Sequence, residues 1–180
     1  ILYAGNLGKA QNFNKILEIS KKLINEKIIF HIVGGGNRYN WLKEKIKKEN
    51  IKNLFLYNNV DFSKIHDYYS KADCLFITLQ NDKFLNMTIP SKLQNYLSTK
   101  KPILSFCGGE TQKIIKKSKC GLDLCNISNE KISKKIKLFF KKKKINLNKM
   151  SLNGYKFFIN NFEIEKIKEN FYWIFENEKI

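Results

Sequence analysis

One stretch of the chain, residues 74–106, reads CLFITLQNDKFLNMTIPSKLQNYLSTKKPILSF. Two apolar runs of strand length, residues 74–79 and 102–106, enclose a segment of helical periodicity, residues 91–99. Eleven residues without periodicity, 80–90, join the first run to the helix. A strand, a helix and a second strand in this order predict a βαβ unit, in which the two strands run parallel.

The same alternation continues on both sides of this stretch. Strands are predicted at residues 1–4, 28–33, 54–57 and 122–124, and helices at residues 14–25, 39–49, 63–70, 110–118 and 128–142. The pattern predicts an α/β fold: a Rossmann-like, doubly wound parallel sheet of six strands with helices on both faces. We expect a single domain over residues 1–180, with the Rossmann-like core at 1–145 and C-terminal helices at 146–180.

Residues 152–180 contain no strand-like run, and their pattern predicts helices at 152–160 and 163–177. The second helix carries a heavy load of large apolar side chains, namely Ile164, Ile167, Phe171, Trp173, Ile174 and Phe175. Two interpretations follow: this helix docks on the sheet of its own domain, or it reaches toward a neighbouring domain outside this chain.

The composition is globular but strongly basic. The net charge is +18, and Arg38 is the only arginine among 34 basic residues. The charge indicates either an anionic partner, such as nucleic acid, a membrane surface or a phosphorylated ligand, or solvated lysines that reflect a compositional bias. The scarcity of arginine argues against nucleic acid, because arginine makes the bidentate contacts to bases and phosphates. No apolar run approaches the roughly 20 residues of a membrane span.

The four cysteines, Cys74, Cys107, Cys120 and Cys125, lack the CxxC spacing of zinc or redox sites. Three of them lie in or beside apolar runs, where cysteine acts as a small hydrophobic side chain. They favour a reducing, cytoplasmic compartment and give no indication of a metal site. The chain opens directly on a strand-like run, and we therefore expect it to be part of a longer protein.

The loops after the first two predicted strands are candidate ligand sites, because ligands of a doubly wound sheet bind outside the carboxyl ends of its strands. Both loops combine glycines, which permit close approach of a ligand, with a cation that could hold a phosphate. The residues are Gly5, Asn6, Gly8 and Lys9 after the first strand, and Gly34, Gly35 and Arg38 after the second. Ordinary turns are the alternative. The third glycine of the dinucleotide fingerprint is missing, which argues against an NAD-dependent enzyme.

The start of the helix at residues 89–92, Ile-Pro-Ser-Lys, is the strongest candidate for an anion site. Pro90 donates no hydrogen bond, and the N–H groups of Ser91, Lys92 and Leu93 would point out of a helix N-terminus with partial positive charge. A normally capped helix is the alternative.

After the third strand, residues 58–60 could offer backbone groups to a flat base. Together these loops predict a cleft for a phosphorylated ligand with one flat ring.

In order along the chain, these segments resemble the C-terminal domain of retaining GT-B glycosyltransferases of the group 1, family 4 type, in particular the surface-polysaccharide transferases. The resemblance spans residues 1–124 and rests on YAGN-x-GKAQ at 3–11, VGGG at 33–36, YYSKAD at 68–73 and PSKLQNYLSTKKPI at 90–103. It implies a domain that binds a nucleoside diphosphate sugar. It also implies an N-terminal acceptor domain outside this chain, to which the final helix crosses back.

The resemblance also assigns roles to individual residues. It implies that the donor diphosphate is bound by Gly5, Asn6, Gly8 and Lys9 together with Ile89, Pro90, Ser91 and Lys92. It places Gly34 and Gly35 beside the nucleotide, residues 57–60, including Asn58 and Val60, along the base, and Asn95 at the ribose. The chain departs from the family pattern at Met87 and Asn95, which occupy the positions of two glutamates, and at Asn6, where an arginine is usual. Asn95 can still bind a ribose hydroxyl, but without charge, so we expect weaker donor binding.

The expected activity is that of a hexosyltransferase that retains configuration, requires no metal and no cofactor, and acts on a lipid-linked glycan acceptor in surface polysaccharide biosynthesis. No catalytic residue is assigned on this chain, and the chain alone is expected to be inactive. The expected partners are the nucleotide sugar, the N-terminal domain and an anionic membrane surface on the cytoplasmic side, with no nucleic acid. The alternative is a basic module that binds nucleic acid or an anionic membrane surface.

Overall fold

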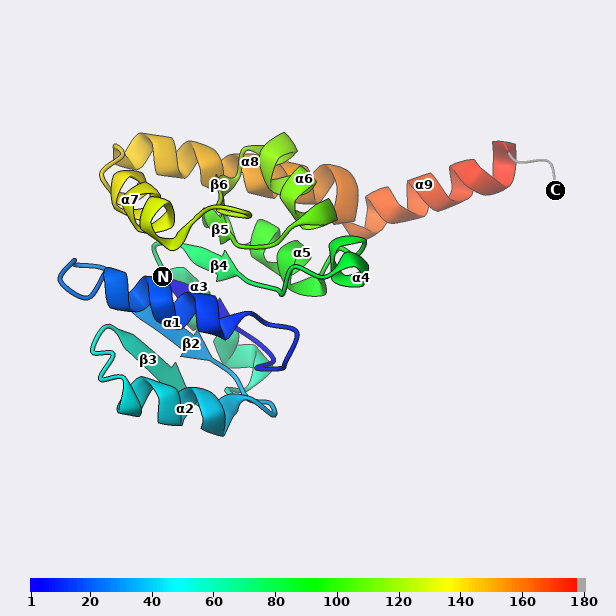
Figure 1. Cartoon of the computed structure of the whole chain (residues 1–180). Helices are drawn as coiled ribbons and strands as arrows, with labels where there is room; N and C mark the ends of the chain where they lie inside the picture. Colours follow the sequence, from blue (N-terminus) through cyan, green and yellow to red (C-terminus); the bar gives the residue numbers. More distant parts are fainter. Residues whose placement is uncertain (178–180) are drawn as a thin grey trace.

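Six parallel strands form one sheet in the order β3-β2-β1-β4-β5-β6 (Figure 1). The computed structural model describes residues 1–177, apart from the side chains of residues 62, 170 and 174–177. The strands are β1 Leu2–Ala4, β2 Phe30–Val33, β3 Leu54–Tyr57, β4 Leu75–Ile77, β5 Ile103–Ser105 and β6 Gly121–Asp123. The order reverses between β1 and β4, as in a doubly wound sheet. The predicted α/β fold with six parallel strands is confirmed.

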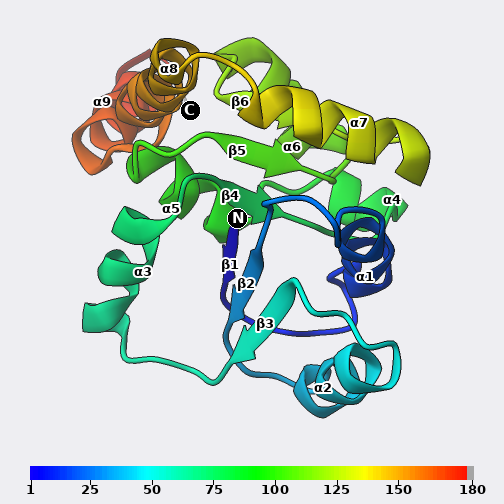
Figure 2. The ribbon, with the colours of Figure 1, turned by 90° about the vertical axis from the view of Figure 1, so that its left-hand side faces the viewer.

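Helices follow each strand and cover both faces of the sheet (Figure 2). They are α1 Phe13–Lys22, α2 Tyr39–Lys48, α3 Ile65–Lys71, α4 Lys83–Asn86, α5 Ser91–Ser98, α6 Gly109–Ser118, α7 Asn129–Phe140, α8 Lys144–Phe162 and α9 Ile164–Asn177. Helices α1, α2 and α7 pack on one face, where Tyr3, Phe30 and Phe76 are buried. Helices α5, α6 and α8 pack on the other face, together with α3. Alternate strand residues point to opposite faces, so the four strands β1, β2, β4 and β5 supply both cores, whereas the edge strands β3 and β6 supply only the first.

Helix α8 begins at Lys144, eight residues before the helix predicted at 152–160, and its first turn crosses the predicted boundary of the core at residue 145. Periodicity missed this start because the buried positions of α8 are Ser151 and Gly154, which are not apolar markers. A Cβ atom at Gly154 would lie 3.0 Å from the Cβ of Cys120, so the glycine permits close contact with the domain.

Two smaller features also differ from the predictions. The stretch 80–90 contains the one-turn helix α4, in which the Asp82 side chain accepts from the N–H groups of Phe84 and Leu85. The helix predicted at 63–70 begins two residues later: Ser63 lies within a 3₁₀ turn, Phe62–Lys64, and α3 begins at Ile65. Single turns of this kind are too short to produce a periodic signal.

The two C-terminal helices behave differently. Helix α8 packs against α5, and Phe157 and Phe158 contribute to the core on that face. Helix α9 contacts α8 and extends away from the sheet (Figure 1), so it does not dock on the sheet of its own domain. Its large side chains include Ile164 and Trp173, which are 65% and 64% exposed. The predicted contributions of Ile174 and Phe175 fall on side chains outside the described set. Within the described part of the chain, no helix is long and apolar enough to cross a membrane.

Candidate functional site

A crevice opens where β1 and β4 separate at the reversal point of the sheet. Strand β1 pairs with β2 along Leu2, Tyr3 and Ala4, but it pairs with β4 only at Leu2 and Leu75. Beyond Leu2 the two strands diverge, and a cavity of about 500 Å³ lies at this carboxyl edge. This is the position at which open α/β sheets bind ligands.

Helix α5 fills the base of the crevice with Tyr96 and Lys92. The buried Tyr96 hydroxyl accepts from the Ala4 N–H at 2.9 Å and donates to the Ala4 carbonyl at 3.3 Å. Lys92 Nζ donates to the same carbonyl and lies 4.2 Å from the centroid of the Tyr3 ring. Burial of this ammonium group lowers the pKa of Lys92 to about 8. The side chain is therefore a poorly hydrated cation that gains by meeting an anion.

Two glycines make the crevice possible. Gly34 has a φ of 152°, and a Cβ atom there would overlap the carbonyl oxygen of Gly5. Gly5 has a φ of 134°, and a Cβ atom there would overlap Lys92 Nζ. Gly34 therefore requires glycine for backbone conformation and for space, and Gly5 requires it for backbone conformation.

The N-terminus of α5 faces the cavity. Pro90 is the N-cap residue and makes no side-chain capping hydrogen bond, while Ser91 and Lys92 follow it in the first turn. The Leu93 N–H, which was predicted to point outward, instead donates to the Pro90 carbonyl at 2.8 Å. The amides of Ser91 and Lys92 thus remain as the candidate donors to an anion.

The described residues that line the cavity include one cation, Lys92, and no carboxylate. Helix N-terminal amides, a partly desolvated ammonium group and no opposing negative charge together suit an anionic ligand such as a diphosphate. Among the described residues, no group of three or more His, Cys, Asp or Glu side chains is placed to hold a metal ion.

Comparison with known proteins assigns the family. The family model of the glycosyl transferases group 1 matches residues 1–157. The chain belongs to the group 1 glycosyltransferases. A relative in Escherichia coli strain K12, WcaI, named as a glycosyl transferase of colanic acid biosynthesis, is 28% identical over 98 residues, which cover 54% of this chain and 24% of the relative. WbjE of Pseudomonas aeruginosa, named as a glycosyltransferase, is 25% identical over 121 residues, which cover 66% of this chain and 30% of the relative. The chain thus spans about a quarter to a third of these relatives.

Solved structures of other proteins share the fold. The C-terminal domain of LpcC from Francisella tularensis, a group 1 glycosyl transferase, superposes with a TM-score of 0.69 at 15% identity, covering 91% of this chain and 85% of that one. TarM of S. aureus in complex with UDP superposes with a TM-score of 0.77 at 16% identity, covering 98% of this chain and 35% of that one. The group 1 chain thus has the architecture of the C-terminal domain of a GT-B glycosyltransferase.

The structure brings together eight of the residues predicted for the group 1 site. They line the cavity and are Gly5, Asn6, Gly34, Val60, Pro90, Ser91, Lys92 and Asn95. Six others lie outside the cavity lining: Gly8, Lys9, Gly35, Arg38, Asn58 and Ile89. Arg38 stacks on Trp41, with its guanidinium carbon 4.9 Å from the ring centroid, and shares a small hollow with Lys9. Met87 is 70% exposed and does not line the cavity.

Nine further residues of the lining are not among the predicted site residues, although Asn59 falls within the stretch 58–60 expected along the base: Ala4, Gln11, Val33, Asn59, Ile65, Tyr69, Ile77, Thr78 and Leu79. Thr78 and Leu79 directly follow β4, so their place after a strand was an available signal. Tyr69 comes from α3 and meets the Tyr96 ring edge-on with centroids 5.9 Å apart. Nothing in its local sequence indicates this contact, because α3 reaches the crevice only through the tertiary fold.

A second cavity, of about 460 Å³, lies at the opposite edge of the sheet. Its lining includes Ile1, Ile28, His31 and Asp73 but none of the glycine loops. Of these two cavities, the crevice at the carboxyl edge combines glycine loops with a helix N-terminus, and it is therefore the candidate site.

Proposed function

We propose that this chain binds the nucleoside diphosphate sugar of a group 1 glycosyltransferase in the crevice between β1 and β4. The observation that carries the proposal is the convergence of the α5 N-terminus, Lys92 and two obligatory glycines at the reversal point of the sheet. The architecture shared with TarM in its complex with UDP supports a nucleoside diphosphate ligand. We assign residues 1–145 to the nucleotide-binding core and the remainder to the C-terminal helices.

The proposed chemistry is transfer of a hexosyl group with retention of configuration and without a bound metal. The bond between the anomeric carbon of the sugar and the diphosphate oxygen breaks, and a bond forms from that carbon to a hydroxyl oxygen of the acceptor. The hydroxyl proton passes to a proton-accepting group, and negative charge accumulates on the leaving diphosphate. The Lys92 ammonium and the first-turn amides of α5 stabilise that charge, which is electrostatic catalysis. In this proposal the binding site for the acceptor and any proton-accepting group lie on an N-terminal domain, so this chain alone transfers no sugar.

The named relatives guide the choice of acceptor. WcaI is named for colanic acid biosynthesis, so we propose a glycan acceptor of a surface polysaccharide, carried on a lipid. The proposal places the enzyme on the cytoplasmic side of the membrane, where nucleotide sugars are available.

A nucleotide titration tests the site directly. Adding UDP, GDP and ADP in turn to the isotope-labelled chain should shift the backbone amide signals of Gly5, Lys92 and Asn95 and reach saturation for at least one nucleotide. Signals of Lys9 and Arg38, outside the cavity, should move less. Absence of saturation with all three nucleotides, or equal shifts with inorganic polyphosphate, would contradict the proposal.

Asn95 offers a gain-of-function test. It lies one turn beyond Ser91 on α5, lines the cavity and is exposed. A charged hydrogen bond stabilises by about 1.5–3 kcal/mol against about 1 kcal/mol for a neutral one. We therefore expect Asn95→Glu to tighten nucleotide binding by roughly 3- to 10-fold in calorimetric titration.

The matched control is Gln94→Glu, which adds the same charge one residue away on a side chain that does not line the cavity. It should leave the affinity unchanged or slightly reduce it. Equal tightening by both variants would show that Asn95 does not contact the ribose.

A further inference from the structure

The positive charge of the chain is unevenly distributed. Residues 131–162 contain ten lysines and no aspartate or glutamate, so this segment supplies ten of the net +18 charges. A compositional bias toward lysine explains a high total charge. It does not explain the absence of every acidic residue from 32 consecutive positions.

The lysines follow the outer faces of α7 and α8. The buried side of α7 consists of Ile132, Ser133, Ile136 and Phe139. Apart from Glu130 in its first turn, which pairs with Lys22, the exposed residues of α7 and of the turn after it are Lys131, Lys134, Lys135, Leu138, Lys141, Lys142 and Lys143. On α8, Lys144 begins the helix, and an exposed stripe follows at Ile145, Lys149, Leu152 and Lys156. These twelve residues form the α7–α8 surface.

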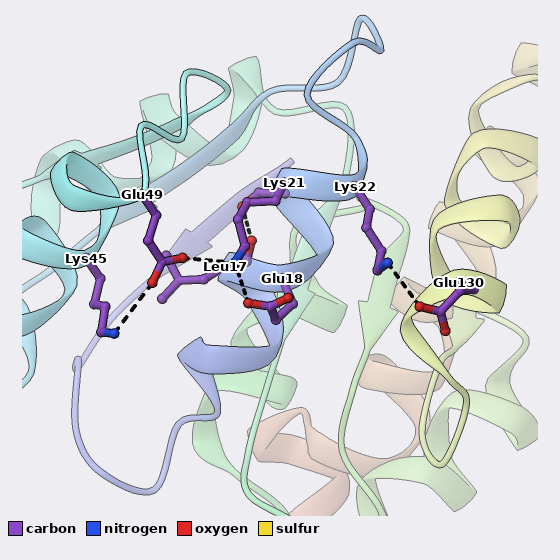
Figure 3. Close-up of polar contacts among 8 residues, drawn as sticks. Leu17, Glu18, Lys21, Lys22, Lys45, Glu49 and Glu130 are labelled. Carbon is purple, nitrogen blue, oxygen red and sulfur yellow. Dashed lines mark hydrogen bonds and ion pairs between the residues drawn. The ribbon is translucent and has the colours of Figure 1, made fainter.

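Few of these charges are neutralised within the chain. Lysines outside this segment meet carboxylates: Lys21 binds Glu49 at 3.0 Å, and Lys22 binds Glu130, the α7 residue just before the segment, at 3.0 Å (Figure 3). Of the ten lysines in residues 131–162, only Lys137 forms an ion pair in the described part of the chain, with Glu26 at 2.8 Å. The remaining nine ammonium groups are available to an external anion.

Exposed apolar side chains lie among the lysines. Leu138 is 63% exposed, Ile145 is 72% exposed and Leu152 is 52% exposed. Leu138 and Ile145 flank the run of four lysines at 141–144 on either side of the turn between the helices. Lysines that surround projecting aliphatic side chains match an anionic lipid surface, where the ammonium groups meet headgroups and the aliphatic groups enter the acyl boundary.

We infer that the α7–α8 surface binds anionic phospholipid. The surface carries no arginine for bidentate contacts and no exposed aromatic side chain on which bases could stack. The exposed aliphatic side chains of this surface would gain no contact from a nucleic acid backbone, which is charged and polar. The turn between α7 and α8 lies at the edge of the sheet opposite the crevice (Figure 1), so lipid binding leaves the nucleotide cavity accessible.

The test measures sedimentation of the 180-residue chain with vesicles. Vesicles of phosphatidylcholine containing about one third phosphatidylglycerol should bind the chain, with an affinity that falls as salt increases, whereas pure phosphatidylcholine should not. Changing Lys141, Lys142, Lys143 and Lys144 to Gln should weaken binding by more than about 20-fold, because each lysine near an anionic membrane contributes roughly fivefold. The variant should bind nucleotide as the parent chain does, which verifies its fold.

The matched control changes four exposed lysines on and after α2, Lys43, Lys47, Lys48 and Lys52, to Gln. The net charge falls by the same amount, but α2 lies at the far end of the same face of the sheet, with α1 between it and α7 (Figure 2). Binding to the anionic vesicles should remain within about threefold of the parent chain. An equal loss in both quadruple variants would overturn the proposal, because total charge rather than this surface would then determine binding.

A second variant distinguishes a lipid surface from a phosphate polymer. Leu138→Gln combined with Ile145→Gln keeps every charge but removes the aliphatic groups, and it should weaken vesicle binding about 5-fold or more without changing binding to polyphosphate. If vesicle binding is unchanged, or if a single-stranded oligonucleotide binds as tightly as the vesicles at equal salt, the assignment to lipid is wrong.

Discussion

The Lys92 ammonium group lies over the Tyr3 ring and donates to the Ala4 carbonyl, and its burial lowers the pKa of Lys92 to about 8 from the ordinary value of 10.5. A bound diphosphate would favour the charged form and raise this pKa again. Nucleotide binding should therefore be accompanied by proton uptake when the solution pH is near or above 8.

This coupling predicts the pH dependence of affinity. Below about pH 8 the free protein already carries the charge; as the pH rises further, the amine loses its proton and the affinity for UDP should fall, by at most tenfold per pH unit. Lys92→Gln should weaken binding by about 10- to 100-fold at pH 7, and its affinity should vary little between pH 7 and 9. Isothermal titration in two buffers of different ionisation enthalpy measures both affinity and proton uptake.

Lys9→Gln is the control, because Lys9 is exposed and lies outside the cavity lining. It should lower the affinity by less than about threefold. If the two variants weaken binding equally, the loop after β1 rather than α5 holds the diphosphate.

Single residues of the site were predictable where local chemistry fixes their role. A proline followed by Ser91 and Lys92 at a helix start indicates an anion site from the sequence alone. Arg38 and Lys9 were chosen for their charge, but charge does not determine direction: Arg38 stacks on Trp41, and Lys9 lies with it outside the crevice lining. The directions of these side chains depend on tertiary contacts that no local pattern encodes.

At the scale of elements, Tyr96 links α5 to the end of β1. Beyond Leu2, β1 no longer pairs with β4, and the Tyr96 hydroxyl accepts from the Ala4 N–H at 2.9 Å. Tyr96→Phe keeps the packing of the ring but leaves a buried N–H without this acceptor. We expect the free energy of unfolding to fall by about 1–3 kcal/mol, as measured by urea denaturation.

Tyr69→Phe provides the comparison. The Tyr69 ring meets Tyr96 edge-on, but its hydroxyl makes no hydrogen bond within the described residues. Its stability should change by less than about 0.5 kcal/mol. A similar loss in both variants would show that the hydrogen bond to Ala4 is not the source of the effect.

The helices and strands themselves were largely predictable, because buried parallel strands appear as continuous apolar runs and amphipathic helices appear as a period of 3.6. Both rules depend on apolar residues marking the buried side. Neither rule detects the start of helix α8, since the buried residues through which it contacts the domain are Ser151 and Gly154. The prediction consequently recovered only the part of α8 that carries Phe157 and Phe158.

At the scale of the whole molecule, the contacts distinguish a C-terminal helix that is part of the folded domain, α8, from one that extends from it, α9. Helix α8 covers α5, whereas α9 packs chiefly against α8. A chain that ends at Glu163 should therefore fold with its thermal midpoint nearly unchanged, as followed by circular dichroism. A chain that ends at Lys143 loses the cover of α5 and should unfold at a temperature at least about 10 °C lower. Loss of cooperative unfolding in the chain that ends at Glu163 would show that α9 is required for the fold.

Helix α9 has a further consequence for how the molecule can be studied. Its 14 residues extend for roughly 21 Å, and Trp173 near its far end is 64% exposed. The chain has only one other tryptophan, Trp41. In a Trp41→Phe background, the indole emission comes from Trp173 alone. The wavelength of maximum emission and the quenching of this emission by iodide then report whether another surface covers the helix. The protein thus contains a built-in optical probe for any surface that covers α9.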